Sequence, residues 1–277
     1  MLNPATIMLA PSGARLTQKD HPALPMSIAE TLATASAARD VGAHALHAHV
    51  RDNNGGHLLD KNLYRELLST AGSKLGADYP IQITTEAVGM YTPAQQIALI
   101  EQIQPRFCSV ALRELLPNGH TPIEEAKTRD FYHWAFNHHI GVQHILYGAD
   151  DIHFYLAQVK AGVIPVEQRS VLIVLGRYGT VQLAKINDVA PAAELANERG
   201  LLWMLCAFGQ TETHCLTQAA ALGGGVRVGF ENSRENNDGS IAADNTERVL
   251  ELTAELRKQQ IQLAAPDQVL RQLGARD

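Results

Sequence analysis

Short apolar runs recur along the whole chain, and longer segments with helical periodicity separate them. Eight runs lie near residues 6–10, 45–50, 81–85, 107–112, 142–147, 171–175, 202–206 and 226–230. This alternation is typical of repeated strand–helix units around a parallel sheet. Eight units over about 250 residues match a closed barrel, whereas open doubly wound sheets more often have fewer strands. The sequence therefore predicts an α/β fold, a (β/α)8 TIM barrel.

Helix-start signals occupy the segments between the apolar runs. A helix over 27–41 is predicted to begin with a capping box, in which Ser27 is followed by Glu30. A second helix, over 92–102, begins with a threonine cap and has Pro93 at its first position, where proline is tolerated. These signals support helices that carry the chain from each strand to the next parallel one.

Nothing in the sequence divides the chain. Its 277 residues contain no Pro/Gly/Ser-rich linker, and a hydrophobic fraction of 45% is enough to build a full core. We therefore expect a single domain over 1–277. The stretch 245–273 extends beyond the eighth unit, and we expect it to form a helical extension that packs outside the barrel.

Charge and cysteine content limit the classes of partner that the protein can bind and the cellular compartment that it suits. The net charge is −6 and no block of Lys or Arg occurs, so we expect neither nucleic acid nor an anionic membrane as a partner. The longest apolar stretches, such as 170–175, are too short to cross a bilayer, and the N-terminus has no targeting pattern. Cys108, Cys206 and Cys215 lack paired spacing, which indicates small buried side chains in a reducing cytoplasm.

Two histidines stand in the second apolar run. His47 and His49 project from one face of a strand, and near the C-terminal end of a barrel strand that face points toward the mouth. Glu231 follows the eighth run, which a closed barrel places close to the second. Two neutral imidazoles and one carboxylate leave a coordination position open, as in catalytic zinc sites. We therefore predict a divalent metal, zinc first, at these residues, with His144 and His214 as spare ligands.

Motifs spread over nearly the whole chain resemble those of a known family. They are Ala10-Pro11-Ser12-Gly13-Ala14-Arg15, His21-Pro22-Ala23-Leu24-Pro25, Gly42-Ala43, His47-Ala48-His49-Val50-Arg51-Asp52, Gly55-Gly56, Thr84-Thr85 and Gly223-Gly224-Gly225-Val226-Arg227-Val228-Gly229-Phe230-Glu231-Asn232. Each motif alone is weak, but the combination is specific. It resembles the β-keto acid cleavage enzyme family.

The resemblance implies a zinc-dependent barrel, usually a homotetramer, that cleaves a carbon–carbon bond and transfers an acyl group. Its substrates would be a β-keto acid and acetyl-CoA, and its products acetoacetate and a new acyl-CoA. It implies the same metal ligands that the spacing predicts, His47, His49 and Glu231. Binding of CoA follows from the resemblance alone, because the sequence contains no glycine-rich phosphate fingerprint.

Four further residues match positions that the family uses for substrate. Arg227 is implied at the reacting centre, where a guanidinium can bind a carboxylate through a bidentate fork. Thr84, Thr85 and Ser109 match hydroxyls that hold substrate. A metal that contacts the ketone and carboxylate oxygens stabilises the enolate formed between them. That enolate would attack the thioester, and a retro-Claisen cleavage would release acetoacetate.

The chain departs from the family pattern beside the predicted arginine. Asn232 stands where family members typically carry an aspartate that works with the arginine, and an amide can neither accept a proton at neutral pH nor supply negative charge. The acid–arginine pair is therefore expected to be incomplete. Glu235 and Asp238, in the following loop, are the carboxylates considered as substitutes.

Three other departures are expected to line the substrate pocket. Arg15 replaces a glutamate that suits a substrate amino group, so a cation at this position favours an acidic or neutral tail. Gly225 replaces a histidine common before the Val-Arg pair, and the fifth run, near Gln143, lacks an acidic residue found in many relatives. These changes predict an altered substrate, or altered chemistry on the same metal.

Alternative functions stay open. An amidohydrolase-type barrel also uses two histidines, but on its first strand and with further histidines on later strands, and the run 171–175 has none near its end. A CoA-independent metal-dependent aldolase or lyase would use the same enolate. A barrel that retains zinc and binds a keto acid without turnover is the non-enzymatic alternative, which the change at Asn232 motivates.

Overall fold

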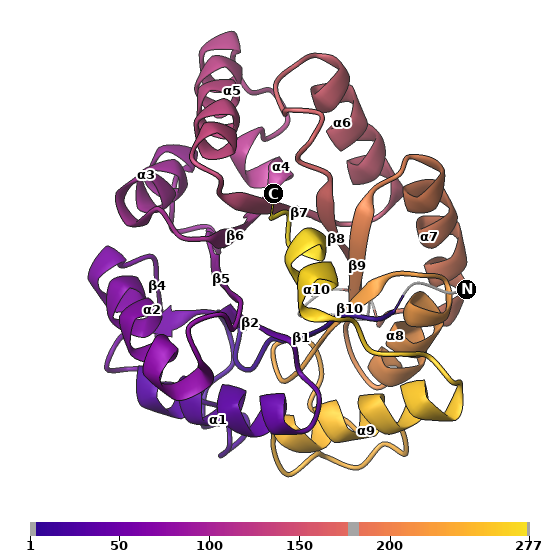
Figure 1. The fold of residues 1–277 in the computed structure, drawn as a ribbon. Helices are drawn as coiled ribbons and strands as arrows, with labels where there is room; N and C mark the ends of the chain where they lie inside the picture. The colour runs from indigo at the N-terminus through magenta and orange to yellow at the C-terminus, as the bar shows by residue number, and fades with distance from the viewer. Residues whose placement is uncertain (1–3, 177–182, 276–277) are drawn as a thin grey trace.

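Eight parallel strands close into a barrel in this computed structural model, which describes residues 4–176 and 183–275 (Figure 1). The strands are β1 (Ile7–Leu9), β2 (Ala45–Ala48), β5 (Ile81–Thr84), β6 (Phe107–Ala111), β7 (Gly141–Leu146), β8 (Ser170–Leu175), β9 (Leu202–Ala207) and β10 (Gly225–Val228). β1 pairs with both β10 and β2, which closes the ring. Each predicted run overlaps one strand of the barrel, so the predicted (β/α)8 barrel is confirmed.

Helices surround the ring of strands (Figure 1). They are α1 (Ile28–Asp40), α2 (Lys61–Leu75), α3 (Pro93–Ile103), α4 (Leu112–Leu115), α5 (Pro122–Asn137), α6 (Ala149–Lys160), η1 (Ile186–Asp188), α7 (Val189–Glu198), α8 (Glu212–Ala221) and α9 (Asn245–Lys258). The predicted capping box at Ser27 is present, and Thr92 caps α3 as predicted. Among the described residues, no helix combines the length and apolarity needed to span a membrane.

Strand residues alternate between two apolar clusters. One cluster fills the barrel interior and includes Met8, Phe107 and Leu172, whereas the other, which includes Leu9, packs between the strands and the helices. This alternation follows from the two-residue period of a strand. Side chains at alternate positions of β2 therefore point into the barrel. A short antiparallel pair, β3 (Val50–Arg51) and β4 (His57–Leu58), follows β2.

The C-terminal extension closes one end of the barrel. α9 packs outside, as expected, beside α8 and α1. The expectation is wrong for α10 (Pro266–Gln272), because Val269 and Leu273 join the cluster inside the barrel. Figure 1 shows α10 across the barrel opening. The Ser170 hydroxyl, at the start of β8, donates a hydrogen bond to the Gln272 carbonyl at 2.6 Å, so α10 covers the N-terminal ends of the strands. Apolar interior side chains at that end drive this packing.

Candidate active site

Three side chains meet near the C-terminal end of the barrel. His47 lies in β2 and His49 just beyond it, and both side chains point to the same inward side as Ala45. They are 1% and 3% exposed, and their Nε2 atoms are 3.1 Å apart. The Oε2 atom of Glu231, which follows β10, lies 3.7 Å from His47 Nε2 and 3.4 Å from His49 Nε2. One nitrogen or oxygen atom from each side chain lies within 4.8 Å of the others. The structure thus brings together the three predicted metal ligands.

A tight turn after β10 places Glu231. Gly229 has a φ of +137°, and a Cβ atom there would lie 2.5 Å from the Ala10 carbonyl oxygen, so only glycine fits. The Phe230 backbone N–H donates to Asn245 Oδ1 at 2.9 Å, and the Glu231 N–H donates to the Ala10 carbonyl at 3.1 Å. β1 and α9 therefore fix the backbone that carries the carboxylate.

The charge states of His47 and Glu231 suit a divalent cation. Burial lowers the pKa of His47 to about 3, so its imidazole is neutral, and its Nδ1–H donates to Gln82 Oε1 at 2.8 Å. His47 Nε2 is then left with a lone pair that faces Glu231. Burial alone would raise the pKa of Glu231, but Arg227 and the two histidines outweigh burial and lower it. Neutral imidazoles and an ionised carboxylate are the donor set of catalytic zinc sites.

A cavity of about 210 Å³ opens beside these side chains. Its polar lining comes from Arg15, His47, Thr84, Glu86, Arg227 and Glu231, and its apolar lining from Ala111, Ile145, Tyr147, Val174 and Phe208. The polar groups stand on the early strands and on β10, and the apolar ones mostly on β6 to β9. The cavity therefore has a charged side, next to the histidines, and an apolar side.

Two of the predicted hydroxyls stand away from this cavity. The Thr84 side chain lines it, but the Thr85 hydroxyl donates to the Ser109 carbonyl at 2.9 Å and so ties together the segments that contain β5 and β6. Ser109 is fully buried in β6, and Ala111, on the same face of that strand, is the residue that borders the cavity. Thr85 and Ser109 are therefore not among the described residues that line this cavity.

Arg227 has a carboxylate partner, contrary to expectation. One of its guanidinium nitrogens lies 3.0 Å from Glu231 Oε1, so the predicted ligand itself completes an acid–arginine pair. Asn232 is buried, is absent from the cavity lining, and its amide atoms have no hydrogen-bond partner among the described residues. Glu235 and Asp238 are outside the lining as well, and Asp238 lies in an exposed turn.

Gly225 and the spare histidines lie elsewhere. A Cβ atom on Gly225 would contact Met204 and Gln272, near the barrel end that α10 closes, so the expectation that Gly225 lines the substrate pocket is wrong. His144 points outward from β7 and is buried between Tyr132 and Tyr155, and His214 is exposed on α8. Neither histidine joins the three converging side chains, because a residue's face on its element decides where it points.

Glu86 is the cavity residue that the sequence reasoning missed. It stands two residues past the end of β5, and its Oε1 atom lies 3.8 Å from a guanidinium nitrogen of Arg15. The available signal was the one that identified Glu231, a carboxylate just past the C-terminal end of a barrel strand. Arg15 itself borders the cavity, as expected, with a side chain that is half exposed.

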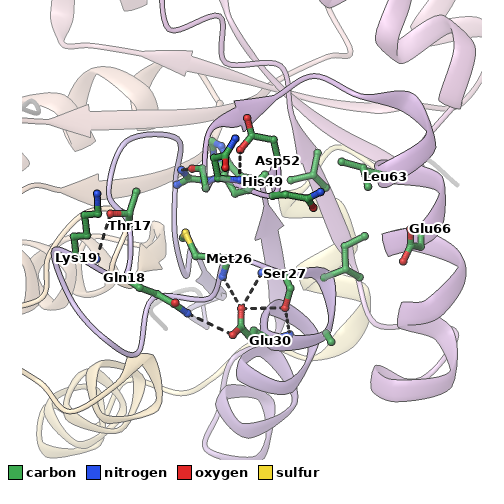
Figure 2. A pocket seen from close by; sticks show the side chains of 17 residues that line it. Thr17, Gln18, Lys19, Met26, Ser27, Glu30, His49, Asp52, Leu63 and Glu66 are labelled. Carbon is green, nitrogen blue, oxygen red and sulfur yellow. Dashed lines mark hydrogen bonds between the residues drawn. The ribbon is translucent and has the colours of Figure 1, made fainter.

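A second, larger cavity of about 890 Å³ has His49 in its lining (Figure 2). Its described lining contains three carboxylates, Glu30, Asp52 and Glu66. The cations in that lining are Lys19, which is exposed, and Arg51, which is buried. An acidic lining of this kind does not suit a polyanion such as CoA.

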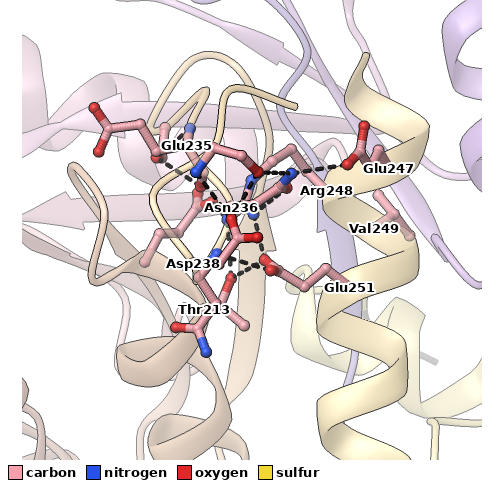
Figure 3. A network of polar contacts seen from close by, with 12 residues as sticks. Thr213, Glu235, Asn236, Asp238, Glu247, Arg248, Val249 and Glu251 are labelled. Atoms are coloured by element: carbon pink, nitrogen blue, oxygen red, sulfur yellow. Dashed lines mark hydrogen bonds and ion pairs between the residues drawn. The ribbon is translucent and has the colours of Figure 1, made fainter. Parts of the chain in front are cut away.

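A buried polar network anchors the segment that follows Glu231 (Figure 3). The Arg248 guanidinium, on α9, lies 2.8 Å from Glu212 Oε2, and both side chains are fully buried. Arg248 also donates to Asn236 Oδ1 at 3.1 Å and to Glu251. α9 also holds the turn before Glu231, because Asn245 Oδ1 accepts the hydrogen bond from the Phe230 backbone N–H. α8, α9 and the turn at the predicted metal ligand are therefore tied to one another.

Comparison with known proteins gives a consistent family. The family model described as beta-keto acid cleavage enzyme matches residues 4–274. The 3-keto-5-aminohexanoate cleavage enzyme of Fusobacterium nucleatum subsp. nucleatum is 25% identical over 277 residues, covering 97% of each chain. The 3,5-dioxohexanoate:acetyl-CoA acetone transferase of Paraburkholderia graminis is 24% identical over 292 residues, covering 94% of this chain and 92% of that protein.

Solved structures share the fold at low sequence identity. The apo structure of ObcA gives a TM-score of 0.65 at 14% identity, covering 92% of this chain and 66% of that chain. A type I 3-dehydroquinate dehydratase from Clostridium difficile gives a TM-score of 0.59 at 10% identity, covering 93% and 94%. These similarities support the barrel architecture.

Proposed function

Because the chain belongs to the beta-keto acid cleavage enzyme family, we propose that it condenses a β-keto acid with acetyl-CoA to give acetoacetate and an acyl-CoA. The reaction would depend on a divalent metal, zinc first, held by His47, His49 and Glu231. The convergence of these three side chains is the observation that carries the proposal. His47 and Glu231 line the cavity of about 210 Å³, which we call the inner cavity.

The names of two relatives support this reaction type. One is a keto acid cleavage enzyme, and the other is an acetyl-CoA acetone transferase, which uses acetyl-CoA as its partner substrate. Both relatives align over nearly the whole chain, so the similarity includes the strands that carry the predicted ligands.

The cavity residues have separate roles in this proposal. When bound, the cation supplies the positive charge that stabilises an enolate. Arg227 is held in place by Glu231 and lines the cavity, where its guanidinium would bind the substrate carboxylate. Thr84 contributes a hydroxyl, although it already accepts a hydrogen bond from the Glu86 backbone at 3.0 Å.

The apolar side of the cavity would determine the length and polarity of the substrate tail. Ile145, Val174 and Phe208 surround this side, which favours a short tail with apolar character. Arg15 stands in the same lining and would repel an ammonium group but attract a carboxylate. We therefore propose a small β-keto acid whose tail is neutral or ends in an acidic group.

We further propose one domain over 1–277 and a homotetrameric assembly, which the family resemblance implies. Size-exclusion chromatography with light scattering measures the assembly directly. A cytoplasmic location stays a prediction.

The proposed reaction is tested with the purified protein and its native metal. The protein is incubated with acetyl-CoA and a panel of β-keto acids, and mass spectrometry follows acetoacetate and new acyl-CoA. His47→Ala should lose both the bound metal and acyl-CoA formation. His214→Ala is the matched control, because this histidine is exposed on α8 and stands outside the site.

If the wild-type protein formed no acyl-CoA from any β-keto acid of the panel, the acyl-transfer proposal would be overturned. If the metal were still bound in equimolar amount, the result would favour a CoA-independent lyase or aldolase on the same site. A keto acid that bound without turnover would favour a non-catalytic binding protein.

A further inference from the structure

The proposed reaction needs a group that takes a proton from carbon, and few cavity residues are able to do so. Among the described residues, the cavity lining contains two carboxylates, Glu86 and Glu231. Glu231 is paired with Arg227 and faces the two imidazoles. Burial raises the pKa of Tyr147 well above its usual value, so its phenol stays protonated at neutral pH. Glu86 is left as the carboxylate able to accept a proton.

The backbone around Glu86 is held on both sides, although it lies beyond the end of β5. Its N–H donates to Thr84 Oγ1 at 3.0 Å, and its carbonyl accepts from His57 Nε2 at 2.8 Å. The next residue, Ala87, donates its N–H to Glu114 Oε2 at 3.1 Å. This segment therefore presents the Glu86 side chain in a defined position, as a catalytic group requires.

The charges around Glu86 suit a base in the same cavity as the cation site. Burial raises the pKa of Glu86, which makes its carboxylate a stronger base than an exposed one. The negative charge of Glu231 acts in the same direction as burial, whereas His49, Arg15 and Arg227 act in the opposite direction and favour the ionised carboxylate. The Arg15 guanidinium at 3.8 Å also orients the carboxylate.

We propose that Glu86 is the general base of the reaction, an inference that rests on the proposed function. Glu86 takes one proton from the carbon between the ketone and carboxylate of the β-keto acid. The electron pair left on that carbon attacks the acetyl carbonyl of acetyl-CoA and expels the CoA thiolate. The thiolate then attacks the ketone carbon of the original β-keto acid. The bond between this ketone carbon and the carbon that lost the proton breaks, which releases the new acyl-CoA. Protonated Glu86 returns its proton to the carbanion, which becomes acetoacetate, so protons and electrons balance.

Acetoacetate itself is the probe that isolates this step. It is the product of the proposed reaction, so it fits the site whatever the tail of the true substrate. In D₂O without acetyl-CoA, NMR measures how fast the enzyme exchanges the protons between its two carbonyl groups, after subtraction of the spontaneous rate. Acyl-CoA formation and metal content by mass spectrometry are measured on the same samples.

The Glu86→Gln variant keeps the shape of the side chain but removes the base. We expect proton exchange and acyl-CoA formation to fall by about 10²-fold or more, with the metal retained, since general bases contribute about 10²–10⁴-fold. Glu86→Asp should recover part of the exchange rate. Glu66→Gln is the matched control, because this glutamate is exposed on α2 and outside the inner cavity.

The outcomes separate this proposal from the proposed function. Wild-type protein that forms acyl-CoA, with Glu86→Gln within about threefold of it in both assays, would overturn only the role of Glu86. Loss of metal from Glu86→Gln would assign the residue to the metal site and would also overturn the role. Wild-type protein that neither exchanges protons nor forms acyl-CoA would overturn the proposed function, and the role of Glu86 with it.

Discussion

Replacing Arg248 with methionine should destabilise the protein substantially. Arg248 is 0% exposed and forms an ion pair with Glu212, which is also 0% exposed. Methionine fills much of the same volume but leaves the Glu212 carboxyl without a cation. Removal of one partner from a buried ion pair costs about 3–5 kcal/mol. With an unfolding entropy of about 2.1 cal/mol/K per residue over 277 residues, the melting temperature should fall by roughly 5–9 °C.

The stability that Arg248→Met loses relative to wild type should also depend on pH. Burial raises the pKa of Glu212 from its ordinary 4.5 to about 7, although Arg248 opposes this shift. Without Arg248 the pKa in the folded state rises further, while the unfolded value is unchanged. The folded variant then binds more protons than the unfolded one above pH 4.5, so its stability falls as pH rises. The variant should therefore lose more stability relative to wild type at pH 8 than at pH 5.

Chemical denaturation followed by circular dichroism measures these differences, with a chelator present so that metal binding does not contribute. The double variant Glu212→Gln/Arg248→Met removes both charges and should recover part of the loss. A loss below about 1 kcal/mol in Arg248→Met would refute the reasoning, as would a double variant no more stable than the single one.

Three further changes have specific expected results. Gln82→Leu removes the acceptor that orients His47 and should weaken zinc affinity about 10–100-fold in a chelator competition. His144→Phe should reduce the loss of stability at acidic pH. Burial lowers the pKa of His144 from 6.5 to about 3, so the unfolded state binds the proton first as the pH falls. The free energy of unfolding of the wild type therefore falls between pH 6.5 and 3, by about 2 kcal/mol at pH 5. Gly224→Ala would place a Cβ atom 2.3 Å from Trp203 and should cost about 1–3 kcal/mol in denaturant unfolding.

Each of these changes has a control or an opposing result. Gly72→Ala, in α2 with no atom within 4 Å of the added Cβ, should leave stability equal or raise it by up to about 1 kcal/mol. Unchanged zinc affinity in Gln82→Leu would mean that the glutamine does not orient the ligand. An acid-unfolding curve of His144→Phe that matched wild type would show that this histidine does not carry the proton uptake.

Local patterns were sufficient for the strands and for the convergence of the ligands. Residues two apart on a strand share a face, which placed His47 and His49 side by side without any knowledge of the fold. Barrel closure then predicted that a residue after β10, Glu231, would reach them. The same rule applied to β5 would have identified Glu86, which also follows a strand end.

Local patterns could not predict how deep in the barrel a side chain lies, or where a side chain past the end of a strand points. Thr84 and Thr85 are neighbours, yet one lines the cavity and the other bonds to the Ser109 carbonyl. Gly225 shares a strand with Arg227 but lies near the closed end of the barrel. Periodicity gives the face of a residue, whereas the depth of its side chain depends on the stagger of all eight strands.

The sequence by itself determined the number of barrel strands, their order along the chain and the pair of histidines, because these follow from short-range periodicity of apolar and polar residues. Only the tertiary structure decided that α10 closes the barrel, that Glu231 pairs with Arg227, and that Glu86 and Arg15 share a cavity. Each of these depends on contact between segments far apart in the chain or on the path of a loop. Side-chain packing and charge, rather than local propensity, select such contacts.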